Sequence, residues 1–213
     1  FAADAGEFNL REDWDSRRER LTAKHDVLEA VDGTSFLTAV TLLVSYKKHM
    51  EKKTAVSCKR VDVLKLTLAE FKELQAQLEE GFKRAAELLA EEKIFDARSL
   101  PYATQLIPLA AICAKLGDKT TQHSIKQRLL RWYWTGVMGE LYGGANETRF
   151  AMDMQDVVAW VDGGPEPRTV RDANFAPARL LSLQSRLAAA YKGLAALLMK
   201  HGGRDFVSGT PID

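Results

Sequence analysis

The chain has 213 residues, of which 46% are hydrophobic and 28% charged, which suits one large globular domain or two small ones with a buried core. Thirty basic and 29 acidic residues leave a net charge of +1, so any contact with DNA must come from a local patch. No apolar run reaches the roughly 18 residues that span a bilayer, so the sequence predicts no membrane-spanning helix and no membrane partner.

The first segment, residues 10–31, is expected to form a charged helix that Asn9 caps and Gly33 ends. Its run of charge at residues 17–20 is interpreted as a solvated face. A second helix is predicted to start at Thr34 or Ser35.

A basic run follows the second helix, and residues 54–65 are predicted to be a loop or a short extended piece. The run consists of Lys47, Lys48, Lys52, Lys53, Lys59 and Arg60. A solvated helix end is the preferred interpretation, because the helix dipole favours cations there. A phosphate-contacting strip is the alternative.

The clearest helix signal begins at Thr67, where Thr67 and Glu70 form a capping box pattern. Apolar residues then recur every three or four positions, which predicts one amphipathic helix to about Lys93. The acidic pairs at 79–80 and 91–92 are adjacent, and adjacent carboxylates diverge on a helix, so we expect no di-metal carboxylate site.

The second half of the chain is also predicted to be helical. Pro101 is expected in the first turn of a buried helix over 102–116, in which Pro108 either kinks the helix or marks a second start. Further helices are expected over 120–136, 150–161, 178–183 and 187–201, separated by glycine-marked turns and a polar loop around Arg168. Trp132, Tyr133 and Trp134 point in different directions on a helix, so core packing is favoured over base stacking.

These elements predict an all-α fold, a multi-helix bundle of roughly eight helices. A boundary near residue 95 would divide it into an N-terminal helical subdomain, residues 1–95, and a C-terminal one with Gly-rich loops, residues 96–205. Residues 206–213 have the composition of a linker. The two cysteines lie apart and match no zinc pattern, and we expect reduced thiols in a cytoplasmic protein.

Several motifs, in this order, resemble one family. They are VSCKR at 56–60, KIFDAR at 93–98, GELYGG at 139–144, ETRFA at 147–151, RDANFAP at 171–177, AYKG at 190–193 and RDF at 204–206. Together they are similar to the GmrSD-like restriction proteins, which are modification-dependent DNA endonucleases of phage defence.

The resemblance implies that this segment is the helical middle of a longer protein. Members of that family carry a ParB-like, NTP-dependent domain before this region and an HNH nuclease with a divalent metal after it. Neither set of motifs stands in this sequence, and its four histidines are isolated. The chain starts at Phe1 and its end would lead toward the nuclease. We therefore expect no catalytic residue, no metal site and no cofactor in this segment.

The candidate site is a set of polar residues in the second half. Arg149, Arg168, Arg171 and Arg179 suit phosphate contacts, and Asn174 can donate and accept hydrogen bonds. The alternative is that these arginines pair with carboxylates, namely Glu140, Glu147, Asp153 and Asp172, and tie the helices together.

Three functions follow from these observations. The first is a non-catalytic scaffold that couples an NTP-dependent sensor to an HNH nuclease, with DNA backbone contact. The second is a protein–protein interaction module without DNA contact. An independent enzyme is the least supported, because the spacing offers no Ser-His-Asp or Cys-His arrangement.

Overall fold

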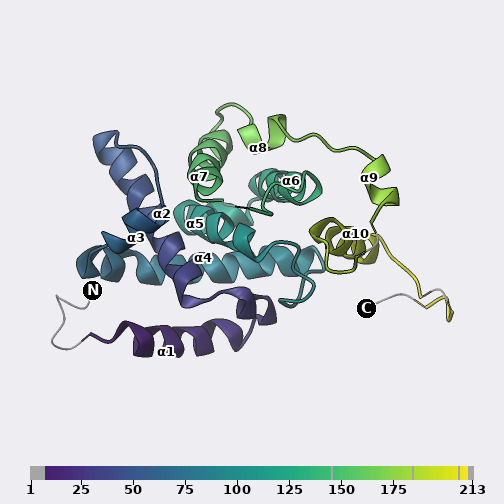
Figure 1. Ribbon diagram of the computed structural model, residues 1–213, viewed down its shortest axis with the longest axis horizontal. Helices are drawn as coiled ribbons and strands as arrows, with labels where there is room; N and C mark the ends of the chain where they lie inside the picture. The colour runs from purple at the N-terminus through teal and green to yellow at the C-terminus, as the bar shows by residue number, and fades with distance from the viewer. Residues whose placement is uncertain (1–7, 145, 184, 206, 211–213) are drawn as a thin grey trace.

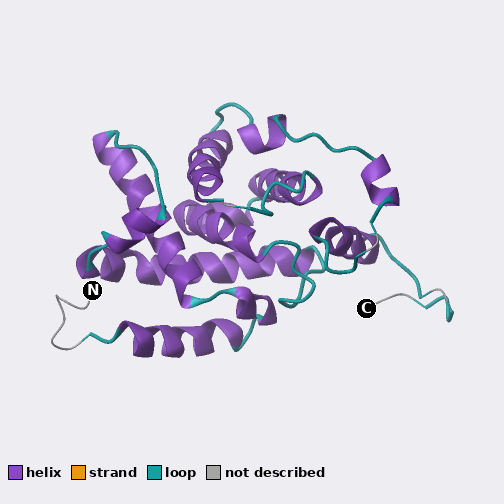
Figure 2. Ribbon diagram, in the orientation of Figure 1, coloured by secondary structure: helices purple, strands orange, loops and turns teal. Residues whose placement is uncertain are grey.

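The computed structural model describes residues 8–144, 146–183, 185–205 and 207–210. This part of the chain contains helices and loops but no strand, so the predicted all-α fold is confirmed (Figure 2). The α-helices are α1 (Leu10–Thr22), α2 (Gly33–Lys52), α3 (Arg60–Leu64), α4 (Leu68–Glu91), α5 (Leu106–Leu116), α6 (His123–Met138), α7 (Glu147–Val161), α8 (Arg168–Arg171), α9 (Ala178–Leu181) and α10 (Ala189–Lys200). Three 3₁₀ helices, η1 (Asp26–Ala30), η2 (Ala103–Gln105) and η3 (Gly117–Thr121), lie between them.

The count in the described residues is ten α-helices against the eight predicted. The two additions are α3 and α8, which are single turns of five and four residues in segments predicted as loops. A single turn is too short to show an apolar period, so the pattern that identifies the other helices is missing there.

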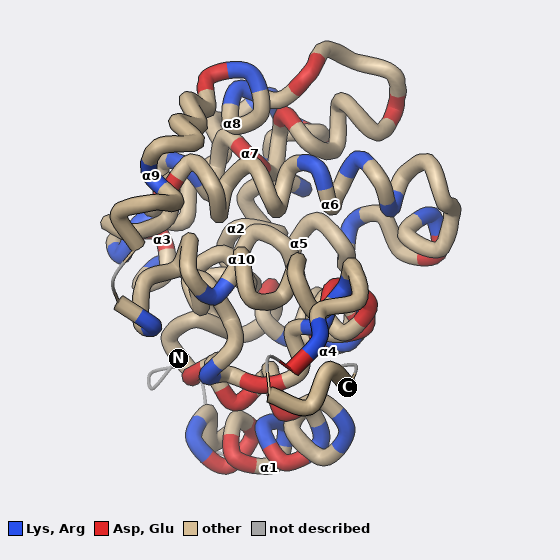
Figure 3. Tube along the Cα trace, turned by 90° about the vertical axis from the view of Figure 1, so that its right-hand side faces the viewer, with Lys and Arg blue, Asp and Glu red and all other residues tan. Residues whose placement is uncertain are grey.

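Helix α4 runs along the long axis of the molecule, with α1 on one side and α5, α6 and α7 on the other (Figure 1). Helix α5 lies in the centre, where ten of its eleven residues are buried. A helix that is apolar on all sides is stable only when other helices surround it. The charged residues lie further out, for example along α1 (Figure 3).

Helices α4 and α5 approach each other closely at Gly81. A Cβ atom at this position would lie 2.3 Å from the carbonyl oxygen of Ala110 and 2.7 Å from the Cβ of Ala114. Buried residues from α2, α4, α5, α6 and α7 belong to one hydrophobic cluster. The division expected near residue 95 therefore runs through a shared core.

The start of α4 confirms the predicted capping box. The amide of Glu70 donates to the Thr67 hydroxyl at 3.3 Å, and the amide of Thr67 donates to the Glu70 carboxylate at 3.0 Å. Both contacts are local in the chain, so a sequence motif defines them completely.

The start of α2 corrects the sequence prediction. Asp32 caps this helix by accepting a hydrogen bond from the amide of Ser35 at 2.7 Å, and Gly33 is the first helical residue. Gly33 was expected to end the preceding helix, which instead stops at Thr22 and is followed by η1. Glycine marks helix ends through a positive φ, but at a first helical position it adopts ordinary helical angles.

Pro108 lies in the first turn of α5, after the short helix η2. This arrangement matches a second helix start rather than a kink, because a first-turn residue needs no amide donor. The helix expected to begin at Pro101 therefore begins at Leu106.

Two predictions about packing have opposite outcomes. Trp132 and Tyr133 are fully buried, and the indole of Trp134 donates to Glu92 at 2.8 Å, so core packing is confirmed. Arg17, by contrast, is only 4% exposed, so the prediction that residues 17–20 form a solvated face is wrong for this residue.

In the described part of the chain, no helix is long and apolar enough to cross a membrane.

Candidate functional site

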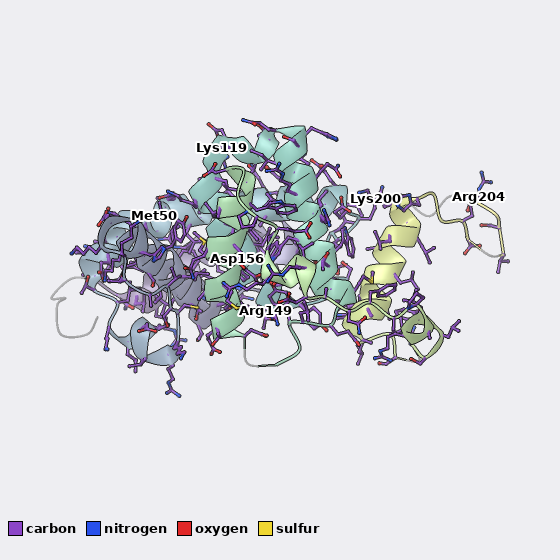
Figure 4. The ribbon with its side chains drawn as sticks, turned by 90° about the horizontal axis from the view of Figure 1, so that it is seen from above. Met50, Lys119, Arg149, Asp156, Lys200 and Arg204 are labelled. Atoms are coloured by element: carbon purple, nitrogen blue, oxygen red, sulfur yellow. The ribbon has the colours of Figure 1, made fainter. Side chains whose placement is uncertain are left out.

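The polar residues singled out in the sequence gather around α7 and α8. Arg149, Asp153 and Asp156 are four and three residues apart, so they share one face of α7. Figure 4 shows Arg149 and Asp156 along this helix, in the middle of the molecule. Gly163, with a φ of +95°, allows the sharp turn that returns the chain over this face as α8.

Asp153 is the buried centre of the site, with 1% of its surface exposed. The hydroxyl of Tyr142 donates to one carboxylate oxygen, and the hydroxyl of Thr169 on α8 donates to the other at 2.5 Å. The guanidinium of Arg149 reaches Thr169 at 3.1 Å. We call Tyr142, Arg149, Asp153 and Thr169 the Asp153 network. It joins the loop after α6 to α7 and α8.

Burial raises the pKa of Asp153, while the hydrogen bonds from Thr169 and Tyr142 oppose this shift. The indole N–H of Trp132 lies close enough to lower the pKa of Asp153 as well, although it completes no well-aligned hydrogen bond. The pKa of Tyr142 is also raised, first by burial and then by the neighbouring Asp153. Both groups therefore keep their protons more strongly than they would in water.

Arg168 forms the best-defined ion pair of the site, with Asp156. Its Nε lies 2.7 Å and its second guanidinium nitrogen 3.0 Å from the two carboxylate oxygens, and its backbone amide adds a third bond at 3.1 Å. This is a bidentate pair between α8 and α7. Burial alone would raise the pKa of Asp156, but the hydrogen bonds from Arg168 lower it below its usual value.

The remaining candidate residues lie further along the chain. Arg179 on α9 forms a bidentate pair with Glu140, at 3.0 and 3.1 Å, and Arg171 pairs with its neighbour Asp172 at 3.1 Å. Asn174 is exposed and makes no hydrogen bond within the described residues.

The structure thus brings Arg149, Arg168 and Arg171 together at α7 and α8, while Arg179 stands apart on α9 (Figure 1). Three of the four arginines bond to carboxylates, and the fourth bonds to a hydroxyl of the Asp153 network. Among the carboxylates anticipated as partners, Glu140 and Asp172 hold arginines directly.

Sequence reasoning missed Asp156 as the partner of Arg168. The available signal was its position three residues after Asp153, on the same face of α7. The sequence does not show that the 163–167 turn brings Arg168 back over that face, because the turn direction depends on the packing of α8.

A cavity of about 470 Å³ lies away from this site, beside α4 and η3. Its charged side chains are mostly paired with each other, as Lys83 with Glu80, Arg84 with Asp118 and Lys126 with Glu91. Cys113 lines it, and burial raises the pKa of this thiol to about 12, so it stays protonated. A protonated thiol is a poor nucleophile. Within the described residues, no group of three or more His, Cys, Asp and Glu side chains is placed to hold a metal ion.

Comparison with known proteins gives little further information. No family model matches the chain. An uncharacterized protein of Methanocaldococcus jannaschii is 27% identical over 81 residues, which are 36% of this chain. The matched segment covers 14% of the archaeal protein, so the chain corresponds to a small part of that relative.

Proposed function

We propose that this chain is a non-catalytic helical scaffold of a GmrSD-like DNA restriction protein, which couples an NTP-dependent sensor domain to an HNH nuclease in the cytoplasm. The observation that carries the proposal is the pairing of the candidate arginines. Arg168 ties α8 to α7 through Asp156, and Arg179 ties α9 to Glu140 in the turn just after α6. These residues fix the relative positions of helices.

A DNA phosphate at these arginines would have to displace Asp156, Asp172 or Glu140. The proposal therefore gives Arg149, Arg168, Arg171 and Arg179 a structural role. Ion pairs of this kind, between partly exposed groups, contribute modestly to stability but define geometry through their bidentate contacts. Defined geometry is what a coupling element requires.

Helix α10 offers the surface on which an adjoining domain would pack. Its inner face is made of small residues, and Gly193 lets it approach Val137 of α6 so closely that a Cβ would lie 2.8 Å from that side chain. Its outer face leaves Leu198 58% and Tyr191 37% exposed. Leu181 and Leu187, just before it, are 92% and 84% exposed. Tyr191 and Leu198 are seven residues apart and share one face of α10, and exposed apolar side chains that share a face are typical of interaction surfaces.

Hydroxyl-radical footprinting tests this proposal directly. In the full-length protein, Tyr191, Leu198 and Leu181 should be labelled several-fold less than in the isolated chain, while exposed Val61 and Leu64 on α3 should be labelled equally. Equal labelling of the α10 residues in both proteins would contradict the scaffold role. The isolated chain should also leave DNA uncut with Mg²⁺ or Mn²⁺, and metal-dependent nicking that one substitution abolishes would contradict the non-catalytic assignment.

A protein–protein interaction module without DNA contact is the second candidate. The same exposed face of α10 favours it, because that face needs an apolar partner whether or not DNA is bound. The two candidates differ in what covers this face, which is a domain of the same protein for the scaffold and a separate protein for the interaction module.

A further inference from the structure

Residues 47–65 carry a cluster of exposed cations that are separate from the arginines of the candidate site. This segment carries seven lysines and arginines against two acids, in a chain whose net charge is +1. Lys47 and Lys48 pair with Glu73 and Glu70 on α4. The other five are exposed and form no ion pair in the described part of the chain. They are Lys52, Lys53, Lys59, Arg60 and Lys65, which we call the basic strip.

Two acids near the basic strip, Asp62 and Glu70, are already engaged. Asp62 accepts hydrogen bonds from the Ser57 hydroxyl at 2.6 Å and from the Lys59 amide at 3.1 Å. Glu70 pairs with Lys48 while it caps α4. Glu51 in this segment and Glu147, whose backbone carbonyl contacts Cys58, have no ion pair among the described residues. The five cations of the basic strip outnumber Asp62, Glu51 and Glu147, so the strip keeps a net positive charge.

Local contacts hold the two parts of the basic strip together. The ring of His49 is 2.6 Å from the carbonyl oxygen of Thr54, and the amide of Ser57 donates to the hydroxyl of Ser45 at 2.8 Å. The chain after α2 thus turns back along that helix and places α3 beside it. Lys53, with a φ of +58°, is the turning residue. The cations of both elements are presented on one end of the molecule, where Figure 4 places Met50.

We propose that the basic strip binds the sugar–phosphate backbone of a nucleic acid duplex. Lysine and arginine side chains that are free of carboxylates can neutralise successive phosphates, and this supplies salt-dependent, sequence-independent affinity. No aromatic side chain belongs to the strip, so it lacks the platform on which the bases of a single strand would stack.

An anionic membrane surface is the competing partner for such a strip, and the fold favours it less. Helices that lie on a membrane expose an apolar face to it. The apolar face of α2 is buried in the core, and α3 is one turn long, so neither offers an apolar face of useful length. Of the exposed apolar side chains here, Met50 lies on α2 and Val61 and Leu64 lie on α3, which is too few for a membrane-binding face.

Fluorescence anisotropy with a short labelled DNA duplex tests the inference on the intact chain. Binding should weaken roughly 50- to 500-fold between about 50 and 200 mM salt, as expected for three to five neutralised phosphates. The triple variant Lys52→Gln, Lys59→Gln, Arg60→Gln should bind about tenfold or more weakly at low salt, and its salt slope should fall by about three. Lys53 is left unchanged because its left-handed backbone makes it sensitive to substitution.

A triple variant near the start of the chain is the matched control, with Arg11→Gln and Arg18→Gln on α1 and Lys24→Gln just after that helix. These residues are also exposed cations without ion pairs among the described residues, and the loss of charge is the same. The control should bind within about twofold of the parent chain. Circular dichroism and urea unfolding should show that both variants remain folded.

Three outcomes would overturn the inference: no binding by the parent chain, equal loss in both triple variants, or affinity that does not change with salt. Strip-dependent binding to phosphatidylserine vesicles without duplex binding would assign the surface to a membrane instead. The α10 footprint concerns the other end of the molecule, so the scaffold proposal and this inference fail independently.

Discussion

Arg17 on α1 and Glu79 on α4 lie 2.5 Å apart in the interior, although 62 residues separate them in the chain. Arg17 is 4% and Glu79 8% exposed. Arg20 also donates to Glu79, at 3.1 Å. This ion pair joins α1 to α4, and removal of Glu79 leaves the buried Arg17 with Asp13 as its remaining carboxylate partner among the described residues.

We expect Glu79→Gln to destabilise the protein by about 3 kcal/mol, the usual cost of breaking a buried pair from one side. Burial tends to raise the pKa of Glu79, but the hydrogen bond from Arg20 and the surrounding cations lower it below its ordinary value. Its stabilisation is therefore present above the unfolded pKa and lost as pH falls through the folded one. Urea unfolding checks both effects. Glu80→Gln, next to it but exposed, should change stability by less than about 0.5 kcal/mol.

The two carboxylates on the inner face of α7 should respond to pH in opposite directions. The pKa of Asp153 is raised above 3.8, chiefly by burial, so the folded protein holds a proton that the unfolded chain has lost. Its contribution to stability is present at low pH and declines as pH rises toward the folded pKa. The stability of Asp153→Asn relative to the parent chain should thus improve as pH rises through this window.

Asp156→Asn is the counterpart of that variant, because the hydrogen bonds from Arg168 outweigh burial and lower the pKa of Asp156. Its relative stability should worsen as pH rises through the same range. Urea midpoints at a series of pH values from acid to neutral give both trends. Parallel trends in the two variants would contradict the assigned environments.

Gly81→Ala should destabilise the protein by about 2 kcal/mol or more, although alanine is the better helix former. The added methyl would meet the backbone of Ala110, which cannot move without shifting α5. Gly33→Ala is the control, because the nearest atom to its added Cβ is a Trp14 side-chain atom at 3.5 Å, an ordinary contact. Thermal unfolding should show the control to be neutral or slightly stabilised.

Arg168→Lys tests the scaffold role of the ion pairs. Lysine keeps the charge but cannot make two parallel bonds to Asp156, so we expect a loss of about 1 kcal/mol after solvent screening. Arg171→Lys, whose partner is its exposed sequence neighbour, should lose less than about 0.5 kcal/mol. Urea unfolding of both variants provides the comparison, and equal losses would argue against a specific bidentate contact.

Features that depend on neighbouring residues were predictable from the sequence. The capping box of Thr67 and Glu70, the apolar stripe of α4 and the burial of Trp132 all follow from spacing along one helix. The second start at Pro108 was one of two alternatives, because a proline is compatible with both a kink and a first turn.

Features that depend on tertiary contacts were not predictable. The charge run at residues 17–20 looks solvated until Glu79 is placed beside Arg17. Pairing of the candidate arginines with carboxylates, Glu140 included, was one of two interpretations of the sequence, but Asp156 was not among the expected partners of Arg168. Local sequence records which groups can pair, and only the packing of helices determines which pairs form.

The 24 residues of α4 make a rod roughly 36 Å long. Near its beginning Glu70 forms an ion pair with Lys48 of α2 at 2.5 Å, and just past its end Glu92 forms one with Lys200 of α10 at 2.6 Å. One continuous helix therefore connects the contacts to α2 with the contacts to α10, and the densely packed core around it resists bending. Under the proposed coupling role, α4 would carry a displacement of α2 to α10 as a rigid body, because no break interrupts the helix.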